Sequence, residues 1–330
     1  MKIKKPDRLV AKILSLPRFL RKRKHMALQI MDFCGIIQKT KNIVPLLKIE
    51  YMPKVFSPTE LRDGKIPSLA DFLLTAEQIH FALNACDGVI GGFVYGSVFH
   101  GTHDIQSDID LFVLLLREKE EGVFAEIQKL QGLAKSKSIP FEIVAIDQKT
   151  AESSANYIGP QFVHHLTLAA ADNKLIKSNP FKRVMLHPID QKDDALNYFQ
   201  NRFRMMNKGY TQTGCDLRDE KLYVFLQNVL QLPMHVARVV LYHCNIRLGK
   251  DSNREVMKKY FDITSREAYN LFFQLLVINN RYQNQLREEI TKGYDEERYC
   301  KAIKELIEGV PLFLKFLRLN FTIIEAKYRL

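Results

Sequence analysis

Two short apolar runs, separated by a polar segment, most strongly constrain the fold of this chain. The first is Val89-Ile-Gly-Gly-Phe-Val-Tyr95, and the second is Ser107-Asp-Ile-Asp-Leu-Phe-Val-Leu-Leu-Leu116. Both runs are short and rich in branched and aromatic side chains, which is typical of buried strands. Gly96 and Ser97 follow the first run directly and indicate a turn. The pattern therefore predicts two strands connected through that turn.

Helical patterns flank these strands. Ser68 lies three residues before Asp71, as in a capping box, and predicts the start of a helix that runs to about Ala85. A second helical stretch follows the strands, with an apolar face formed by Phe124, Ile127, Leu130 and Leu133. It leads into a third apolar run, Ile139–Asp147, which predicts another strand.

The second apolar run begins with two acids, Asp108 and Asp110. Side chains two residues apart on a strand point to the same face, about 6.5–7 Å apart along the chain. Two carboxylates at the start of a buried strand repel each other and are costly without a cation between them. Mg²⁺ supplies that compensation and binds phosphate oxygens as well. The alternative is a pair of solvated loop acids beside the strand.

The turn at Gly96-Ser97 precedes this acid pair. We expect Val98–Thr102 to form a short helix whose free backbone N–H groups point at a phosphate. Gly96 and Gly101 have no side chains, so the backbone can approach a ligand closely there. A phosphate-binding turn beside a metal-binding acid pair is the arrangement that a nucleoside triphosphate needs.

A third acid for this site is expected from the third strand. Glu142 lies near the start of that strand and Asp147 at its end. Their odd spacing places them on opposite faces, so only one of them can join the pair. A charge inside an otherwise apolar strand needs a reason more than a charge at its edge, which favours Glu142. The alternative for Glu142 is a solvated acid.

These residues together resemble a known family signature. Phe93-Val-Tyr-Gly-Ser97, Gly101-Thr102 and Ser107-Asp-Ile-Asp-Leu111 resemble the motif of the polymerase-β-like nucleotidyltransferase superfamily. That motif is a hydrophobic strand, Gly-Ser, a spacer, and then Asp-hydrophobic-Asp. The resemblance covers about Ser68–Asp147. The third acid of the superfamily is more often Asp, so Glu142 departs from its usual pattern.

The resemblance implies roles for individual residues. Asp108 and Asp110 would bind two Mg²⁺ (or Mn²⁺) ions, and Glu142 would bind the catalytic ion and help activate the acceptor hydroxyl. Gly96 and Ser97 would hold the β- and γ-phosphates of a nucleoside triphosphate substrate. Basic residues after the third strand are candidates for completing the triphosphate site: Lys174, Lys177, Lys182 and Arg183. The alternative for these cations is ordinary solvated charge.

The resemblance also implies the fold. We expect an α+β protein whose nucleotidyltransferase core, a small mixed sheet with flanking helices, precedes an α-helical bundle. The expected organisation is a basic N-terminal arm and extension at residues 1–67, the core at 68–185 and the helical domain at 186–330. One helix is expected around residues 25–38.

The C-terminal half carries helix signals but no second motif. Ser252-Asn-Arg-Glu255 and Ser265 predict helix starts. Pro233 and Pro311 suit first helical turns. Four glycines are expected to end helices: Gly209, Gly249, Gly293 and Gly309. Four basic residues could line a cleft or lie on the surface: Arg202, Arg204, Lys208 and Arg238.

The charge of the chain is concentrated at its start. The formal net charge is +12, yet residues 1–24 hold ten cations and one acid, which leaves +3 for the remaining residues. A basic amphipathic segment is typical of a nucleic-acid arm, a membrane-surface helix or an organellar targeting segment. A solvated terminus that packs its apolar stripe on the body is the fourth reading. RNA is therefore a candidate partner, and peripheral membrane contact stays open.

Other features of composition limit the class of protein. No stretch approaches 18 consecutive apolar residues, which argues against a transmembrane helix. The five cysteines are scattered and form no Cys-x-x-Cys pair, which argues against a disulfide framework and a zinc cluster. We therefore expect a reducing, cytoplasmic location. The sequence does not indicate the oligomeric state.

The resulting hypothesis is an enzyme, a Mg²⁺-dependent nucleotidyltransferase that moves a nucleoside monophosphate from a triphosphate to an acceptor hydroxyl by a two-metal mechanism. RNA, such as a tRNA end, is the favoured acceptor because of the basic arm. The alternatives are an oligonucleotide-signal synthase, nucleotidylation of a protein or small molecule, and a non-catalytic regulatory protein that keeps the fold.

Overall fold

A computed structural model describes most of the chain after its first 53 residues. The described residues are 54–153, 155–156, 158–186, 189–212, 217, 219–246, 248 and 253–329, and all of them belong to one compact unit, residues 50–330. The basic arm, the helix expected around residues 25–38, the helix start at Ser252 and the stop at Gly249 lie outside the described residues.

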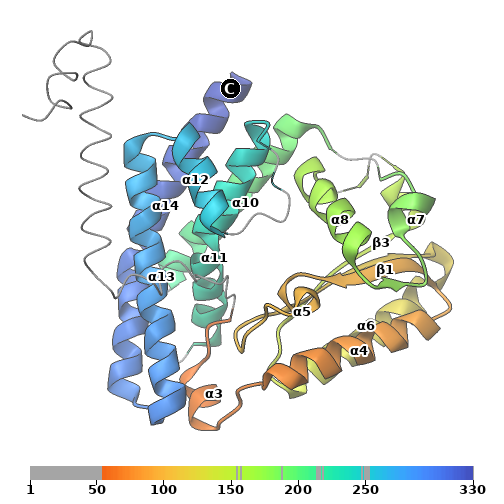
Figure 1. Ribbon diagram of the computed structural model, residues 1–330, viewed down its shortest axis with the longest axis horizontal. Coiled ribbons are helices and arrows are strands. Elements are labelled where there is room, and N and C mark those ends of the chain that lie inside the picture. Colours follow the sequence, from red (N-terminus) through yellow and green to blue (C-terminus); the bar gives the residue numbers. More distant parts are fainter. Residues whose placement is uncertain are drawn as a thin grey trace, which may run out of the picture. The chain divides into compact units, whose positions relative to one another are not determined.

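A four-stranded mixed sheet forms the centre of the first half (Figure 1). Its strands are β1 (Val89–Tyr95), β2 (Ile109–Leu115), β3 (Phe141–Asp147) and β4 (Leu175–Ile176), and they lie in the order β3-β2-β1-β4. β1 is antiparallel to both β2 and β4, whereas β2 and β3 are parallel. The three longer strands coincide with the apolar runs of the sequence, and the α+β class with a small mixed sheet is confirmed.

Helices cover both faces of this sheet (Figure 1). On one face, residues such as Leu111 and Val113 of β2 pack against the apolar stripes of α4 (Leu69–Ala85) and α6 (Glu120–Ser136). On the other face, Phe112 and Leu114 pack against three helices: α7 (Gln148–Ala151), α8 (Pro160–Asp172) and α9 (Pro180–Arg183). Because neighbouring side chains alternate between the faces, Asp110 lies on the α8 face with Phe112.

The predicted capping box at the start of α4 is present. The Ser68 Oγ accepts a hydrogen bond from the Asp71 N–H, and the Asp71 carboxylate accepts one from the Ser68 N–H at 2.9 Å. The bonds satisfy backbone donors that the first helical turn leaves free. The helix ends at Ala85, as the sequence predicts, and delivers the chain to β1.

The second half is helical, as predicted. Its elements are α10 (Gln191–Gln212), α11 (Glu220–His243), α12 (Asn253–Ile263), α13 (Arg266–Lys292) and α14 (Glu296–Tyr328). Ser265 caps α13 and Gly293 ends it, both as expected. Within the described residues, α11 alone is long and apolar enough to cross a membrane, but 67% of its most apolar window is buried inside the protein. That burial is typical of the core helix of a bundle.

Four predicted boundaries in this half are wrong. Gly209 and Gly309 lie inside α10 and α14, and Pro233 and Pro311 lie inside α11 and α14. A Cβ at Gly209 would collide with the Phe225 ring of α11, so this glycine serves close helix packing instead of a helix stop. Tertiary packing overrides the local signal of the prolines, because the helices that contain them bury extensive apolar faces.

A strap before α4 connects the two halves. It includes α3 (Pro58–Arg62) and begins at Lys54, whose backbone pairs with that of Gln106 and whose Nζ forms an ion pair with Glu60. Phe56 is fully buried, and its carbonyl accepts a hydrogen bond from the Tyr299 hydroxyl of α14. Residues 54–62 therefore contact both the sheet region and the bundle.

Candidate active site

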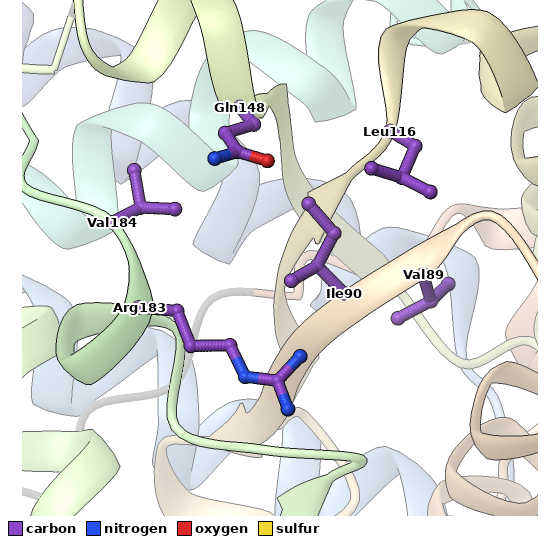
Figure 2. Close-up of a pocket in the computed structure, with 6 residues that line it drawn as sticks. All are labelled: Val89, Ile90, Leu116, Gln148, Arg183 and Val184. Atoms are coloured by element: carbon purple, nitrogen blue, oxygen red, sulfur yellow. The ribbon is translucent and has the colours of Figure 1, made fainter.

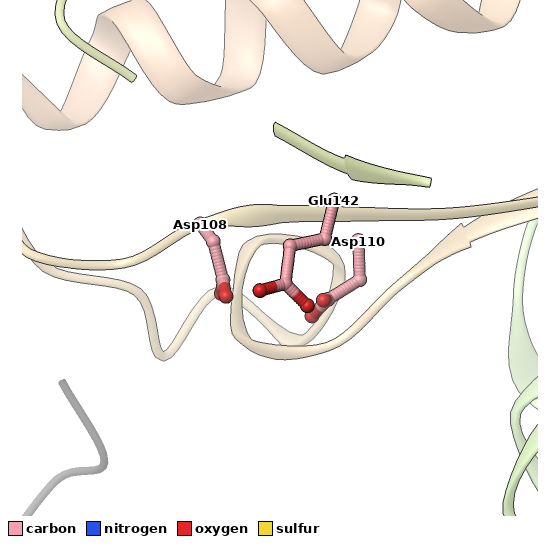
Figure 3. Close-up of side chains that lie close together, drawn as sticks. All are labelled: Asp108, Asp110 and Glu142. Atoms are coloured by element: carbon pink, nitrogen blue, oxygen red, sulfur yellow. The ribbon is translucent and has the colours of Figure 1, made fainter. Parts of the chain in front are cut away.

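Three carboxylates converge at one end of the sheet (Figure 3). Asp108 immediately precedes β2, Asp110 lies within it, and Glu142 lies opposite Asp110 in the register of β2 and β3. One carboxylate oxygen from each residue lies within 4.8 Å of the other two. The strand period of two places Asp108 and Asp110 on one face of the sheet. The parallel register of β2 and β3 then brings Glu142 to the same place, and the two effects together form this acid triad.

The electrostatics of the acid triad are unfavourable for free carboxylates. Burial, together with the neighbouring charge of Glu142, raises the pKa of Asp108 to about 7. Burial and the charges of Asp108 and Glu142 raise the pKa of Asp110 well above its usual value. Within the described part of the chain, no Lys or Arg forms an ion pair with any of the three. The triad thus lacks a compensating protein cation in that part.

The donor atoms of the acid triad suit a divalent metal ion. Carboxylate oxygens are hard ligands that Mg²⁺ and Mn²⁺ prefer. Asp108 and Asp110 are half-buried and Glu142 is exposed, so an ion and its further ligands can reach the site. Within the described ranges, no other group of three His, Cys, Asp or Glu residues meets the same geometric test.

The turn after β1 lies directly against the acid triad. Gly96 has φ +81°, a conformation that side chains disfavour, and a Cβ at this position would collide with the Asp110 carboxylate. The next residues form α5 (Ser97–His100), which confirms the expected short helix and starts it one residue earlier than expected. Glycine is therefore required at residue 96 for two independent reasons, conformation and space.

Tyr95 connects the acid triad to the α8 face. The phenol is buried, and burial together with the charges of Asp110, Glu142 and Asp108 raises its pKa. Its ring lies edge-on to the imidazole of His165, which belongs to α8, with 5.8 Å between the ring centroids. The tyrosine thus lies between the carboxylates and that helix.

The predicted basic residues lie in different places. Lys174 is exposed just before β4. The Lys177 Nζ donates to the Cys86 carbonyl at 2.5 Å, and its backbone N–H donates to Asn84, at the start of β1 and away from the acid triad. Lys182 and Arg183 are exposed on α9. The structure does not bring Lys177 together with the carboxylates.

Asp147 is the acid that the sequence disfavours as the third metal ligand. It lies at the far end of the sheet, which is the end opposite the acid triad, where β1 starts. Its carboxylate accepts a hydrogen bond from the Arg117 Nε at 2.8 Å and another from the Thr150 N–H at 3.0 Å. Burial alone would raise its pKa, but the bonds from Thr150 and Arg117 outweigh burial and lower it. Asp147 therefore acts as a helix cap and ion-pair partner.

A shallow cavity of about 430 Å³ lies at this far end too (Figure 2). It is lined by Val89, Ile90, Leu116, Gln148, Arg183 and Val184. These residues begin β1, end α9 or follow β2, β3 and α9, whereas the acid triad lies at the opposite strand ends. The cavity is therefore separate from the candidate active site.

Comparison with protein families agrees with this geometry. Residues 82–159 match the family model for the nucleotidyltransferase domain. The match covers about a quarter of the chain, from the end of α4 to the start of α8, and includes Gly96, Ser97 and the acid triad. It confirms the resemblance to the polymerase-β-like nucleotidyltransferase superfamily. Comparisons with curated proteins and with solved structures found no match.

Sequence reasoning did not single out two histidines that lie outside the segment matching the nucleotidyltransferase domain. His165 lies on α8, and His235 lies on α11 three residues before Arg238. A polar stripe at His235, Arg238 and Tyr242, spaced i, i+3 and i+7 in a mostly apolar helix, was the available signal. Of the basic residues named from the sequence, Arg202 and Arg238 are half-buried, whereas Arg204 and Lys208 are exposed.

Proposed function

We propose that this protein transfers a nucleoside monophosphate from a nucleoside triphosphate to an acceptor hydroxyl, with Mg²⁺ or Mn²⁺ as its cofactor. The single observation that carries the proposal is the convergence of Asp108, Asp110 and Glu142 within 4.8 Å, inside a segment that matches the nucleotidyltransferase domain. Hard oxygen ligands of this kind support the binding of divalent metal ions together with phosphates.

The residues of the site divide the work of such a reaction. Asp108, Asp110 and Glu142 would hold the metal, which, when bound, supplies Lewis-acid stabilisation of the charge on the reacting phosphate. The acceptor oxygen forms a bond to the α-phosphorus, the bond to the β-phosphate oxygen breaks, and pyrophosphate leaves. The exposed carboxylate of Glu142 is accessible to the incoming hydroxyl and is our candidate to take its proton.

The turn after β1 would hold the leaving phosphates. Ser97 is half-buried and follows Gly96, which lies against Asp110, and the Ser97 hydroxyl and N–H can each donate to a phosphate oxygen. Gly96 has no side chain, so the turn can lie against the Asp110 carboxylate without a clash. Phosphate positioning and charge neutralisation supply most of the catalysis in such reactions.

RNA is our proposed acceptor class. The support is the charge of residues 1–24, ten cations against one acid, beside a body whose net charge is +3. Clustered lysine and arginine residues favour association with phosphate backbones. A reducing cytoplasmic location, supported by the scattered cysteines, is part of the same proposal.

The test is incorporation of label from each α-³²P nucleoside triphosphate, with Mg²⁺ or Mn²⁺, into total RNA, protein and small-molecule acceptors. The full chain should label RNA, and an Asp108→Ala/Asp110→Ala double variant should not. Asp87→Ala is the matched control, because Asp87 is exposed and pairs with Lys119. It lies just before the start of β1, at the sheet end away from the acid triad. Equal labelling by the wild type and the double variant would contradict the metal assignment.

The acceptor is tested in the same experiment. Labelling of protein or of a small molecule alone, with RNA unlabelled, would contradict RNA as the acceptor and leave nucleotidyl transfer intact. Nucleotide binding without labelling of any acceptor would favour the non-catalytic regulatory alternative over an enzyme.

A further inference from the structure

The shallow cavity at the far end of the sheet has no part in the proposed reaction. Its volume of about 430 Å³ lies within the range of roughly 300–1,000 Å³ that small-molecule sites occupy. Two of its lining residues are polar, Gln148 and Arg183, and the others are aliphatic (Figure 2): Val89, Ile90, Leu116 and Val184. An apolar lining with a few polar groups is the composition typical of a ligand site.

The lining contains an irregularity of β1. Val89 pairs with Leu115 of β2, and Gly91 pairs with Leu114, so Ile90 is one residue in excess of the partner strand. An extra residue of this kind is a β-bulge, which bends the strand and changes the direction of a side chain. The bulge lies at the cavity and nowhere else in the pairing of β1 with β2.

The bulge turns Ile90 toward the cavity. Strict alternation along β1 would place Ile90 on the face of Val94, opposite Phe93. Ile90 instead packs against the core cluster that contains Phe93 and Val184. Val89 correspondingly packs in the cluster of Val94. Ile90 remains only half-buried there, so part of its side chain is available to a ligand.

A short anchored helix presents Arg183 at the rim of the cavity. The Phe181 ring of α9 stacks on Phe112 of β2, with 5.5 Å between the ring centroids. The Asn179 side chain caps α9 by accepting a hydrogen bond from the Phe181 N–H at 3.0 Å, and Val184 is buried directly after the helix. The backbone on both sides of Arg183 is therefore held, whereas its side chain is exposed.

The two polar side chains of the lining are unoccupied within the described part of the chain. There, neither the Arg183 guanidinium nor the Gln148 amide forms a hydrogen bond or an ion pair. The carboxylate of Asp147, the residue before Gln148, already accepts from Arg117 and Thr150. The cavity therefore offers a positive charge and an amide beside aliphatic surface.

This combination suits an anion with an apolar body. A guanidinium binds a carboxylate through two parallel hydrogen bonds, and an amide NH₂ adds a further donor. Aliphatic side chains cover the hydrocarbon part of the ligand, and a flat ring can lie on the floor of a shallow cavity. The lining holds no nucleophile and no general acid or base, so a ligand would be bound there without being converted.

We propose that this cavity is a second ligand site, which binds a small aromatic carboxylate. The carboxylate lies on Arg183 and Gln148, and the ring lies over Ile90 and Leu116. Arg183, which the sequence offers as a candidate for the triphosphate site, thus serves a different anion at the opposite end of the sheet. The site is independent of nucleotidyl transfer.

The test is calorimetric titration of the full chain, without nucleotide or metal, with 2-naphthoate and with its neutral counterpart 2-naphthamide. Arg183→Gln should weaken binding of 2-naphthoate about tenfold and change binding of 2-naphthamide less than about twofold. Lys182→Gln is the matched control, because Lys182 is exposed on the same helix and does not line the cavity. It should change binding of 2-naphthoate less than about twofold.

Three outcomes would overturn the proposal. The first is no binding of 2-naphthoate by the wild type at millimolar concentration. The second is equal binding by the wild type and Arg183→Gln, which would place the ligand on other apolar surface, such as the exposed Leu73 and Leu74 of α4. The third is an equal loss in Lys182→Gln, which would show general attraction between charges. Because no turnover is measured, failure of the proposed function would leave this site standing.

Discussion

Carboxylates at the two ends of the sheet have opposite electrostatic environments. At the far end, Asp147 accepts hydrogen bonds from Arg117 and Thr150, and its pKa is lowered. At the other end, burial and mutual repulsion raise the pKa values of Asp108 and Asp110. Asp147 and Glu142 belong to the same strand, only five residues apart. Within the described residues, Asp147 has a cationic partner in Arg117, whereas no Lys or Arg forms an ion pair with the acid triad.

This difference supports our proposal that Asp147 has a structural role and the acid triad a functional one. An acid that is paired and capped stabilises the fold and has little capacity left for a ligand. A cluster of acids with raised pKa values costs stability, and such a cost is typical of functional sites.

The largest expected effect separates the two acids of β3. Glu142→Gln should lower nucleotidyl transfer on the order of a thousandfold, because it removes a negatively charged ligand of the metal site. Asp147→Asn, its matched control, should leave transfer within about threefold and lower stability by about 1 kcal/mol. Incorporation of labelled nucleotide and urea unfolding provide the two readouts. Similar activity losses in both variants would contradict the assignment of Glu142, and not Asp147, to the active site.

The next effect concerns Gly96. Gly96→Ala should reduce transfer about a hundredfold, because the new Cβ displaces the Asp110 carboxylate in addition to straining a backbone with φ +81°. Gly101→Ala is the control, since Gly101 has φ +66° but open space around its Cβ position. Both variants should lose about 1 kcal/mol of stability, and only Gly96→Ala should lose activity. Comparable activity in the two variants would refute the requirement for space at residue 96.

The acid triad should also make metal-free protein less stable as the pH rises. The folded protein holds protons on Asp108, whose pKa is about 7, that the unfolded chain releases near pH 4. The free energy of unfolding should therefore fall by about 1–2 kcal/mol between pH 4 and pH 7. Mn²⁺ should raise Tm by about 3 °C or more at pH 8 and by about 1 °C or less at pH 5.

Asp108→Asn provides the control for this pH dependence. The variant should be more stable than the wild type at pH 8 without metal, and Mn²⁺ should stabilise it much less. Thermal unfolding by circular dichroism measures both quantities. A wild type whose metal-free stability rises between pH 4 and pH 7 would contradict the raised pKa of Asp108, unless Asp108→Asn rises by a larger amount.

The smallest effect on stability is expected at the sheet end where Asp147 pairs with Arg117. A double-mutant cycle between Arg117→Ala and Asp147→Asn should give a coupling energy below about 1 kcal/mol, because Arg117 is exposed. The lowered pKa of Asp147 means that this stabilisation is present above about pH 4 and is lost as the pH falls through the lower folded-state value. A coupling energy of several kcal/mol would show that this end is more than a structural ion pair.

Much of the acid triad could be predicted from the sequence because it depends on local rules. The three apolar runs become β1, β2 and β3, and the strand period of two places Asp108 and Asp110 together. The choice of Glu142 over Asp147 follows from the position of each acid along its strand. Its parallel pairing with Asp110 then comes from the register of β2 and β3.

Features that depend on distant contacts could not be predicted in this way. β4 has two residues, too few to produce a pattern. Gly209 looks like a helix stop until Phe225 of the next helix is placed against it. The charge of Arg238 on α11 helps to lower the pKa of His165 on α8, yet no local periodicity connects these residues, which are 73 positions apart. Pairings of this kind come from the packing of the helices on the sheet.

The anchor of Phe56 has a consequence for biosynthesis. Its carbonyl is held by the hydroxyl of Tyr299, which is 243 positions further along the chain. During translation the strap is synthesised early, whereas α14, which carries Tyr299, is synthesised near the end. The Phe56 carbonyl therefore lacks this partner until Tyr299 has been made, and a chain truncated after Asp295 should leave the strap without this anchor and more accessible to proteases.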